Sequence, residues 1–199
     1  MNAISDVMFW ISTGLLVPVM VLLIVLFLRA LLLMGAFFGQ YMSMRKSEKV
    51  IKQEMDNLTI ATIDGLVERI PAKKDSLMLT YMADMLKEDV AEAQIKRLVA
   101  NFEIEADKDL AGSKTLTKMG PILGLMGTLI PMGPALVGLS TGDIGSMAYN
   151  MQVAFATTVI GLFAGAIGFI TGQVKQRWYL QDITNLDFLA ELLIEKKKK

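Results

Sequence analysis

The chain of 199 residues contains no cysteine and no histidine. Without cysteine there is no disulfide framework and no thiol chemistry. Without histidine the chain lacks the commonest metal ligand and the usual proton shuttle. Its 20 basic residues balance 20 acidic ones, so the net charge gives no general attraction to nucleic acid. We therefore expect no nucleic-acid partner, no metal site and no cofactor.

Catalytic signatures are also absent from the sequence. The glycines stand mainly in apolar stretches, and none belongs to a loop ending in Gly-Lys-Ser/Thr, the pattern that cradles phosphate. No nucleophile stands beside a plausible base, as covalent catalysis would require. The sequence therefore does not predict an enzyme.

Apolar residues are abundant and occur in long runs. They make up 53% of the chain, and the mean hydropathy is +0.47. Three runs are long enough to cross a hydrocarbon core of about 30 Å as helices. We predict an all-α integral membrane protein with three transmembrane helices and long cytoplasmic helical extensions. The predicted segments are an outside head (1–6), the first transmembrane helix and its extension (7–38), a cytoplasmic helical region (39–118), the second transmembrane helix (119–139), an outside loop (140–147), the third transmembrane helix (148–174) and a cytoplasmic tail helix (175–199).

Lysine and arginine are concentrated on one side of the predicted spans. They follow the first span, precede the second and follow the third, whereas the head and the 140–147 loop have none. The positive-inside rule therefore places the N-terminus outside and the C-terminus in the cytoplasm. We expect the membrane to be the inner (cytoplasmic) membrane of the cell. Trp178 and Tyr179 follow the third span, where an aromatic belt is expected.

Two residues mark the first span. Pro18 predicts a kink in it. Arg29 falls near its inner end. There Arg29 either snorkels to the lipid headgroups, the reading we favour, or pairs with the carboxylate of a partner.

The charged region between the first and second spans has apolar residues at helical spacing. Pro71 predicts a break between two long helices, with the turn over 72–75. Gly112 and Ser113 predict a joint before the second span.

The hairpin from Met119 to Val174 organises the rest of the chain. Its only charge is Asp143, in the connection between the two spans. Glycines on both spans let helices approach closely in lipid. The predicted packing glycines are Gly124, Gly127, Gly161, Gly165, Gly168 and Gly172. The threonines at mid-span are Thr128, Thr157 and Thr158. Their hydroxyls either bond to their own helix or line a polar pathway, and residue chemistry alone leaves both open.

The two spans contain no carboxylate, histidine or lysine within the lipid. A proton pathway needs a titratable group. The chain therefore cannot relay protons by titration of its own side chains. If it conducts ions, a partner helix must supply a carboxylate.

Two segments of the hairpin resemble the MotA/TolQ/ExbB proton channel family. Residues 124–129 read GLMGTL, which is similar to the family's second-span pattern G-L-x-G-T-V. Residues 156–164 read ATTVIGLFA, which is similar to the third-span pattern A-T-A-I-G-L-x-A-A. The order of spans and loops also resembles the three-span TolQ/ExbB branch.

This resemblance implies a subunit of an ion-motive-force-driven motor or energiser, with protons as the expected ion. Family members assemble as pentameric rings around a single-span partner of the ExbD/TolR/MotB type, which carries a membrane aspartate. The resemblance places Thr128 and Thr158 on the ion route beside that aspartate, with Thr157 as an additional hydroxyl. Ion flow is then converted into mechanical work.

Three positions depart from the family's pattern. Relatives usually have a glutamate five residues before the third-span threonine, where this chain has Val153. Pro131 and Pro134 interrupt the second span and favour a bend in its outer half.

A non-conducting membrane scaffold that organises partner proteins is the alternative function.

Overall fold

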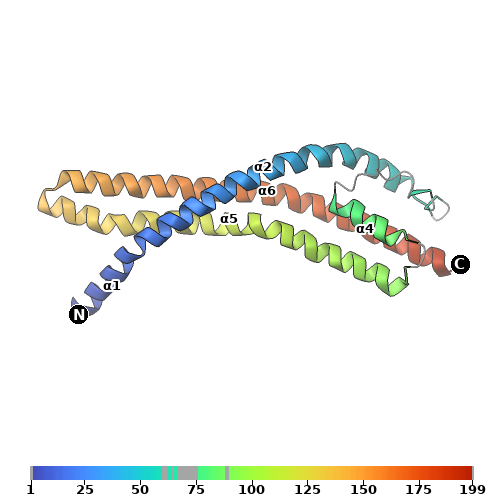
Figure 1. Cartoon of the computed structure of the whole chain (residues 1–199), viewed down its shortest axis with the longest axis horizontal. Helices are drawn as coiled ribbons and strands as arrows, with labels where there is room; N and C mark the ends of the chain where they lie inside the picture. Colours follow the sequence, from blue (N-terminus) through green and yellow to red (C-terminus); the bar gives the residue numbers. More distant parts are fainter. Residues whose placement is uncertain (1, 60–61, 64, 67–75, 88–89, 199) are drawn as a thin grey trace. The chain divides into compact units, whose positions relative to one another are not determined.

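The computed structural model describes residues 2–59, 62–63, 65–66, 76–87 and 90–198. The regular secondary structure of these residues is helical (Figure 1): α1 (Asn2–Gly14), α2 (Leu16–Asp56), α4 (Leu77–Met85), α5 (Glu92–Thr141) and α6 (Ile144–Lys198). Three helical stretches are long and apolar enough to cross a membrane, within 3–42, 92–141 and 144–198. The protein is therefore all-helical with three candidate spans, as predicted. Pro71 and the turn predicted over 72–75 lie outside the described residues.

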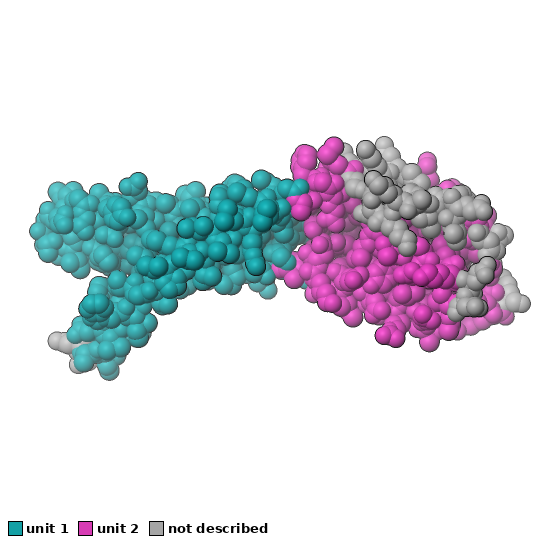
Figure 2. Space-filling view, viewed as in Figure 1, with its two compact units in different colours: residues 1–35, 112–172 teal, residues 36–111, 173–199 magenta. Residues whose placement is uncertain are grey.

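The chain divides into two compact units, which are described separately (Figure 2). Unit 1 comprises residues 1–35 and 112–172, and unit 2 comprises residues 36–111 and 173–199. Unit 1 therefore holds most of the apolar hairpin, whereas unit 2 holds most of the charged residues.

The first apolar stretch is interrupted near its beginning. The backbone leaves the helix at Leu15, between α1 and α2. Pro18 lies three residues further on, and it has no N–H to donate to the carbonyl group of Gly14. The loss of this bond accounts for the interruption at this point.

α5 is longer than the sequence predicts. It runs unbroken through Gly112 and Ser113, so the joint predicted there is not a break in the helix, although the boundary between the two compact units falls at Gly112. Ser113 does not disturb the helix because its hydroxyl lies 3.1 Å from the Thr171 hydroxyl of α6 and so has a partner other than the backbone. The helix also continues through the two prolines of its outer half, Pro131 and Pro134.

The connection between α5 and α6 is shorter than the loop predicted over 140–147. Only Gly142 and Asp143 lie between the two helices. Gly142 has a φ of 78°, the left-handed conformation that commonly follows the end of a helix. The Asp143 carboxylate accepts a 3.0 Å hydrogen bond from the backbone N–H of Ser146, as an N-cap residue does. These two residues suffice to reverse the chain.

Unit 1 is built around one face of α2 packed on the hairpin. Val19, Leu23, Leu26 and Ala30 recur at helical spacing on α2 and are all buried. They share an apolar cluster with residues of α5 and α6, namely Leu116, Leu123, Ile130, Ala164 and Ile167.

Unit 2 has a core rich in methionine and aromatic residues. Phe102 is fully buried and contacts the rings of Tyr81 and Tyr179 edge-on, with centroid distances of 5.6 and 6.2 Å. Its buried methionines are Met55, Met78, Met82 and Met85. Tyr179 is 7% exposed and belongs to this core, so it does not stand in a lipid-facing belt. Trp178 is half-buried and stacks on Phe37 at 5.7 Å.

Candidate functional site

Glycines bring the backbones of α5 and α6 into contact within unit 1. A Cβ atom at Gly161 would lie 2.5 Å from the carbonyl oxygen of Gly120 and 2.7 Å from the Cα atom of Gly124. A Cβ atom at Gly120 would lie 2.6 Å from the carbonyl oxygen of Gly161. Real Cβ atoms do not approach backbone atoms so closely, so both positions require glycine.

At the other five predicted packing glycines the nearest atom also belongs to the opposite helix. The distances from a Cβ atom to that atom would be 3.3 Å at Gly124, 2.6 Å at Gly127, 2.8 Å at Gly165, 2.7 Å at Gly168 and 3.3 Å at Gly172. The contact between the two helices is therefore tight along its length and loosest at Gly124 and Gly172.

Thr128 and Thr158 lie near the same carbonyl group. The hydroxyl of each is 3.5 Å from the carbonyl oxygen of Gly124, Thr128 from the same helix and Thr158 from across the hairpin. Each also has a nearer acceptor in its own helix, the carbonyl oxygen of Leu125 at 2.7 Å and that of Ala154 at 3.1 Å. Because a hydroxyl has one proton to donate, the nearer bonds use it and the oxygen lone pairs stay available.

Thr157 is placed differently from these two residues. It is 7% exposed and donates to the carbonyl oxygens of Ala154 at 2.9 Å and Val153 at 3.1 Å. Its Cβ atom and its hydroxyl oxygen would each lie 2.6 Å from a Cβ atom at Gly127. This is the geometry of a packing residue, so it does not favour the expectation that Thr157 lies on an ion route.

Arg29 lies on the exposed side of α2, next to the fully buried Ala30. Two residues before it, Phe27 contacts Phe163 of α6 with ring centroids 5.9 Å apart. Arg29 forms no ion pair with the described residues. Its guanidinium group is therefore open to lipid headgroups or to another chain.

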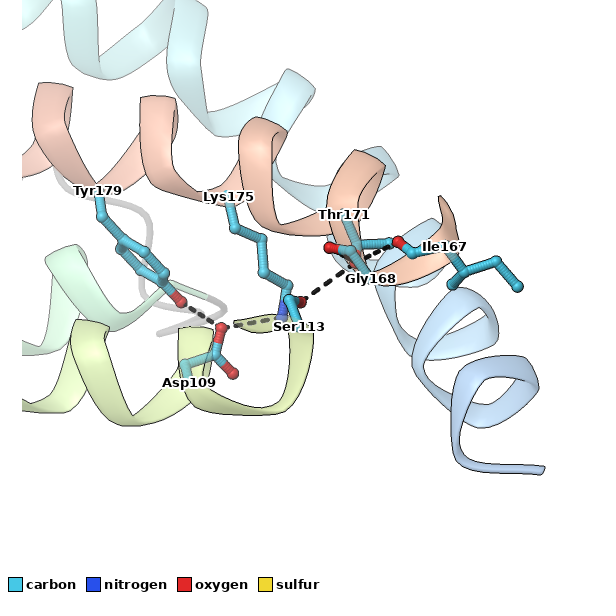
Figure 3. Close-up of polar contacts among 7 residues, drawn as sticks. All are labelled: Asp109, Ser113, Ile167, Gly168, Thr171, Lys175 and Tyr179. Atoms are coloured by element: carbon cyan, nitrogen blue, oxygen red, sulfur yellow. Dashed lines mark hydrogen bonds and ion pairs between the residues drawn. The ribbon is translucent and has the colours of Figure 1, made fainter. Parts of the chain in front are cut away.

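A buried pair of hydroxyls between α5 and α6 in unit 1 was not predicted from the sequence (Figure 3). The hydroxyl oxygens of Ser113 and Thr171 are 3.1 Å apart, and the two residues are 0% and 3% exposed. Thr171 donates to the carbonyl oxygen of Ile167 at 2.7 Å, which makes Ser113 the donor within the pair. Such interhelical bonds in apolar surroundings are worth about 1 kcal/mol.

Unit 2 contains an ion pair that was also not predicted (Figure 3). The Lys175 ammonium and the Tyr179 hydroxyl both donate to one oxygen of Asp109, at 2.8 and 2.7 Å. Lys175 is 6% exposed. Burial acts to raise the pKa of the Asp109 carboxyl, but the bonds from Lys175 and Tyr179 outweigh it, and this pKa lies below its ordinary value of 3.8. Burial and the bond to Asp109 raise the pKa of Tyr179.

One signal in the sequence points to these residues. Thr171, Lys175 and Tyr179 follow one another at intervals of four, and so do Asp109 and Ser113. This spacing puts each set on one face of a helix.

Replacing Gly161 by alanine should destabilise the hairpin, because the new methyl group would meet backbone atoms that cannot move aside. We expect a clearly lower midpoint of thermal unfolding for the full chain purified in detergent. Gly39→Ala is the matched control, since nothing lies within 4 Å of a Cβ atom there. Equal midpoints for the two variants would contradict the described contact.

Asp109→Ala should destabilise the protein more than Lys175→Met. Loss of the carboxylate leaves a nearly buried ammonium without its counter-ion, which costs about 3 kcal/mol for a fully buried pair. The cost is smaller here because the Asp109 side chain is 42% exposed. Lys175→Met instead leaves a carboxylate that water and Tyr179 still solvate. Unfolding in detergent measures both losses, and equal losses would contradict this asymmetry.

The same pair predicts a dependence on pH. The pKa of Asp109 is lowered in the folded protein, so its stabilisation is present above pH 3.8 and is lost as the pH falls through the lower, folded value. The difference in unfolding midpoint between the wild type and Asp109→Ala should therefore shrink in acid. A difference that stays constant down to pH 2 would contradict the assigned partners.

Comparison with known proteins places the hairpin in a family. The family model described as the MotA/TolQ/ExbB proton channel family matches residues 48–187. The curated proteins and the solved structures give no match. The matched region covers most of the chain and includes both segments, 124–129 and 156–164, that resemble the family's span patterns. The chain belongs to the MotA/TolQ/ExbB proton channel family.

Proposed function

We propose that this chain is the ring-forming subunit of a membrane motor driven by an ion-motive force, with protons as the ion. One observation carries the proposal: a member of a proton channel family has no acidic or basic residue in 119–139 or 148–174. Movement of protons through lipid needs a titratable group. A carboxylate must therefore come from another chain, and a single-span partner of the ExbD/TolR/MotB type supplies it.

The hydroxyls of Thr128 and Thr158 form the part of the ion route that this chain contributes. Thr128 lies nine residues after Met119, which corresponds to roughly 14 Å of a hydrocarbon core of about 30 Å. Both side chains are half-buried, and both lie beside the carbonyl oxygen of Gly124. Their lone pairs can solvate a cation or hold water next to the carboxyl group of the partner.

The outer faces of α5 and α6 support an assembly in lipid. Large apolar side chains on these helices are more than half exposed, among them Leu125, Leu129, Leu136, Phe155 and Val159. Lipid or neighbouring copies must cover such surfaces. In the proposed pentamer, one part of this surface faces lipid and another faces the partner.

The membrane potential is large enough to drive mechanical work in this arrangement. Each charge that crosses the membrane releases about 2.3 kcal/mol per 100 mV, so two charges release between about 4 and 5 kcal/mol. With the N-terminus outside and the C-terminus in the cytoplasm, unit 2 receives this work on the cytoplasmic side. Arg29 then lies near the inner headgroups, where it snorkels.

Thr128→Val and Thr158→Val test the route, since each keeps the shape of threonine and deletes the hydroxyl. We expect each variant to lower proton flow at least about tenfold, as is usual when a positioned polar group is lost. The measurement is a pH-sensitive dye inside vesicles that contain the complex purified on the tagged full chain. Replacement of either threonine by serine should keep the flow.

Thr184→Val is the control for these substitutions. Thr184 is exposed on α6, the helix that also holds Thr158, and it donates to the carbonyl oxygen of Leu180 at 2.9 Å. Loss of the Thr184 hydroxyl should therefore leave proton flow unchanged. Full flow in both Thr128→Val and Thr158→Val would reject the proposed route.

A non-conducting scaffold is favoured by one specific observation: each hydroxyl near the Gly124 carbonyl already has a nearer acceptor in its own helix. That function predicts no proton flow through wild-type vesicles. It also predicts that removal of the partner's membrane carboxyl group leaves the biological output unchanged, whereas the proposed motor loses it.

A further inference from the structure

Within residues 119–139 and 150–171, one polar side chain has no hydrogen bond to the part of the chain that the structure describes. Residues 119–139 and 150–171 are all described, and five of their polar side chains donate to a backbone oxygen: Thr128, Asn150, Thr157, Thr158 and Thr171. Within this stretch Gln152 has no such bond, and it is exposed on α6.

Gln152 lies within the predicted hydrocarbon core, four residues inside the outer end of the 148–174 span. Two contacts define the register of the hairpin, that of Gly127 with Thr157 and that of Gly138 with Met147. Gln152 falls midway between them on α6, which puts it level with Met132 of α5. Met132 lies 13 residues after Met119, or about 20 Å into a core of about 30 Å. An amide left without partners in such a medium costs several kcal/mol, between about 2 and 7.

The surroundings of Gln152 suit a helix from another chain. Ala148 and Ala156 lie one turn before and one turn after it, and both are exposed. Residues four apart share a face of the helix. Small side chains on that face let a second helix come close enough for the amide to reach it.

We propose that Gln152 binds the carboxyl group of a single-span partner helix that packs against Ala148 and Ala156. This inference rests on the proposed function, which requires a carboxyl group from another chain. A primary amide suits both protonation states, because its NH₂ group donates to a carboxylate and its oxygen accepts from a protonated carboxyl. A bond to an ionised acceptor is also about twice as strong as one between neutral groups, which favours a carboxylate over the glutamine of a second copy.

A designed peptide tests this assignment without knowledge of the natural partner. The full chain is placed in phosphatidylcholine vesicles with a single-span Leu/Ala peptide that bears one aspartate in its outer third. A second peptide has leucine in place of the aspartate. Because the chain lacks cysteine, Ser140→Cys provides a unique site for a fluorescent label, and energy transfer reports binding.

The aspartate peptide should bind the labelled chain about tenfold more tightly than it binds the same chain with Gln152→Leu, the effect of one interhelical polar bond. The leucine peptide should bind both chains equally. Gln173→Leu, the same substitution at an exposed position of the same helix but at the opposite, inner end of the predicted span, should behave as the wild type.

Equal binding of the aspartate peptide by the wild type and Gln152→Leu would overturn the inference. A smaller oligomer of Gln152→Leu without any peptide would also overturn it, because the amide would then bind a second copy.

Gln152→Glu keeps the size of the side chain and covers the case in which the leucine variant fails to fold. Two carboxyl groups must share a proton, so this variant should bind the aspartate peptide in acid and lose it at neutral pH. An unchanged pH profile would contradict the proposed contact.

These results are separable from those on proton flow. If Gln152→Leu binds the aspartate peptide as tightly as the wild type does, while the threonine variants stop proton flow, this inference alone fails. If wild-type vesicles conduct no protons, the proposed function fails, whatever the peptide shows.

Discussion

The hairpin depends on one contact, that between the backbones of α5 and α6 at Gly120, Gly124 and Gly161. In lipid the hydrophobic effect does not press helices together, so close van der Waals contact has to supply the attraction. The contact also sets the register of the two helices. The Thr158 hydroxyl lies beside the Gly124 carbonyl because the backbone of α6 is held against α5 one turn away.

The same contact restricts where an ion can pass. A seam in which even a methyl group would clash has no room for a hydrated ion between α5 and α6. The polar groups that remain accessible stand at the outside of the hairpin, where Thr128 and Thr158 are half-buried and Gln152 is exposed. A route that includes them is enclosed only when another chain covers this face. Conduction is therefore a property of the proposed assembly, to which a single chain contributes one wall.

The three spans were predictable from the sequence because long apolar runs need no tertiary information. The unbroken path of α5 through Gly112 was not, since it depends on a partner for the Ser113 hydroxyl that lies on another helix. The contact between Asp109 and Lys175 escaped prediction for a similar reason. The intervals of four residues are visible in the sequence. Which face of α5 lies against which face of α6, however, depends on the register of these two antiparallel helices. Gln152 could not be singled out from the sequence, because an isolated amide in an apolar run becomes informative only when the other polar side chains around it are known to have hydrogen-bond partners.

The chemistry of the hairpin favours a division of labour between two chains. Hydroxyl and amide groups do not titrate in the range where proteins work, so they cannot carry a proton themselves. They can, however, set the pKa of a carboxyl group placed beside them. Burial in lipid raises that pKa, and hydrogen bonds to the ionised form lower it again. In the proposed function, Thr128, Thr158 and Gln152 therefore determine when the partner's carboxyl group binds and releases its proton, although none of them changes charge.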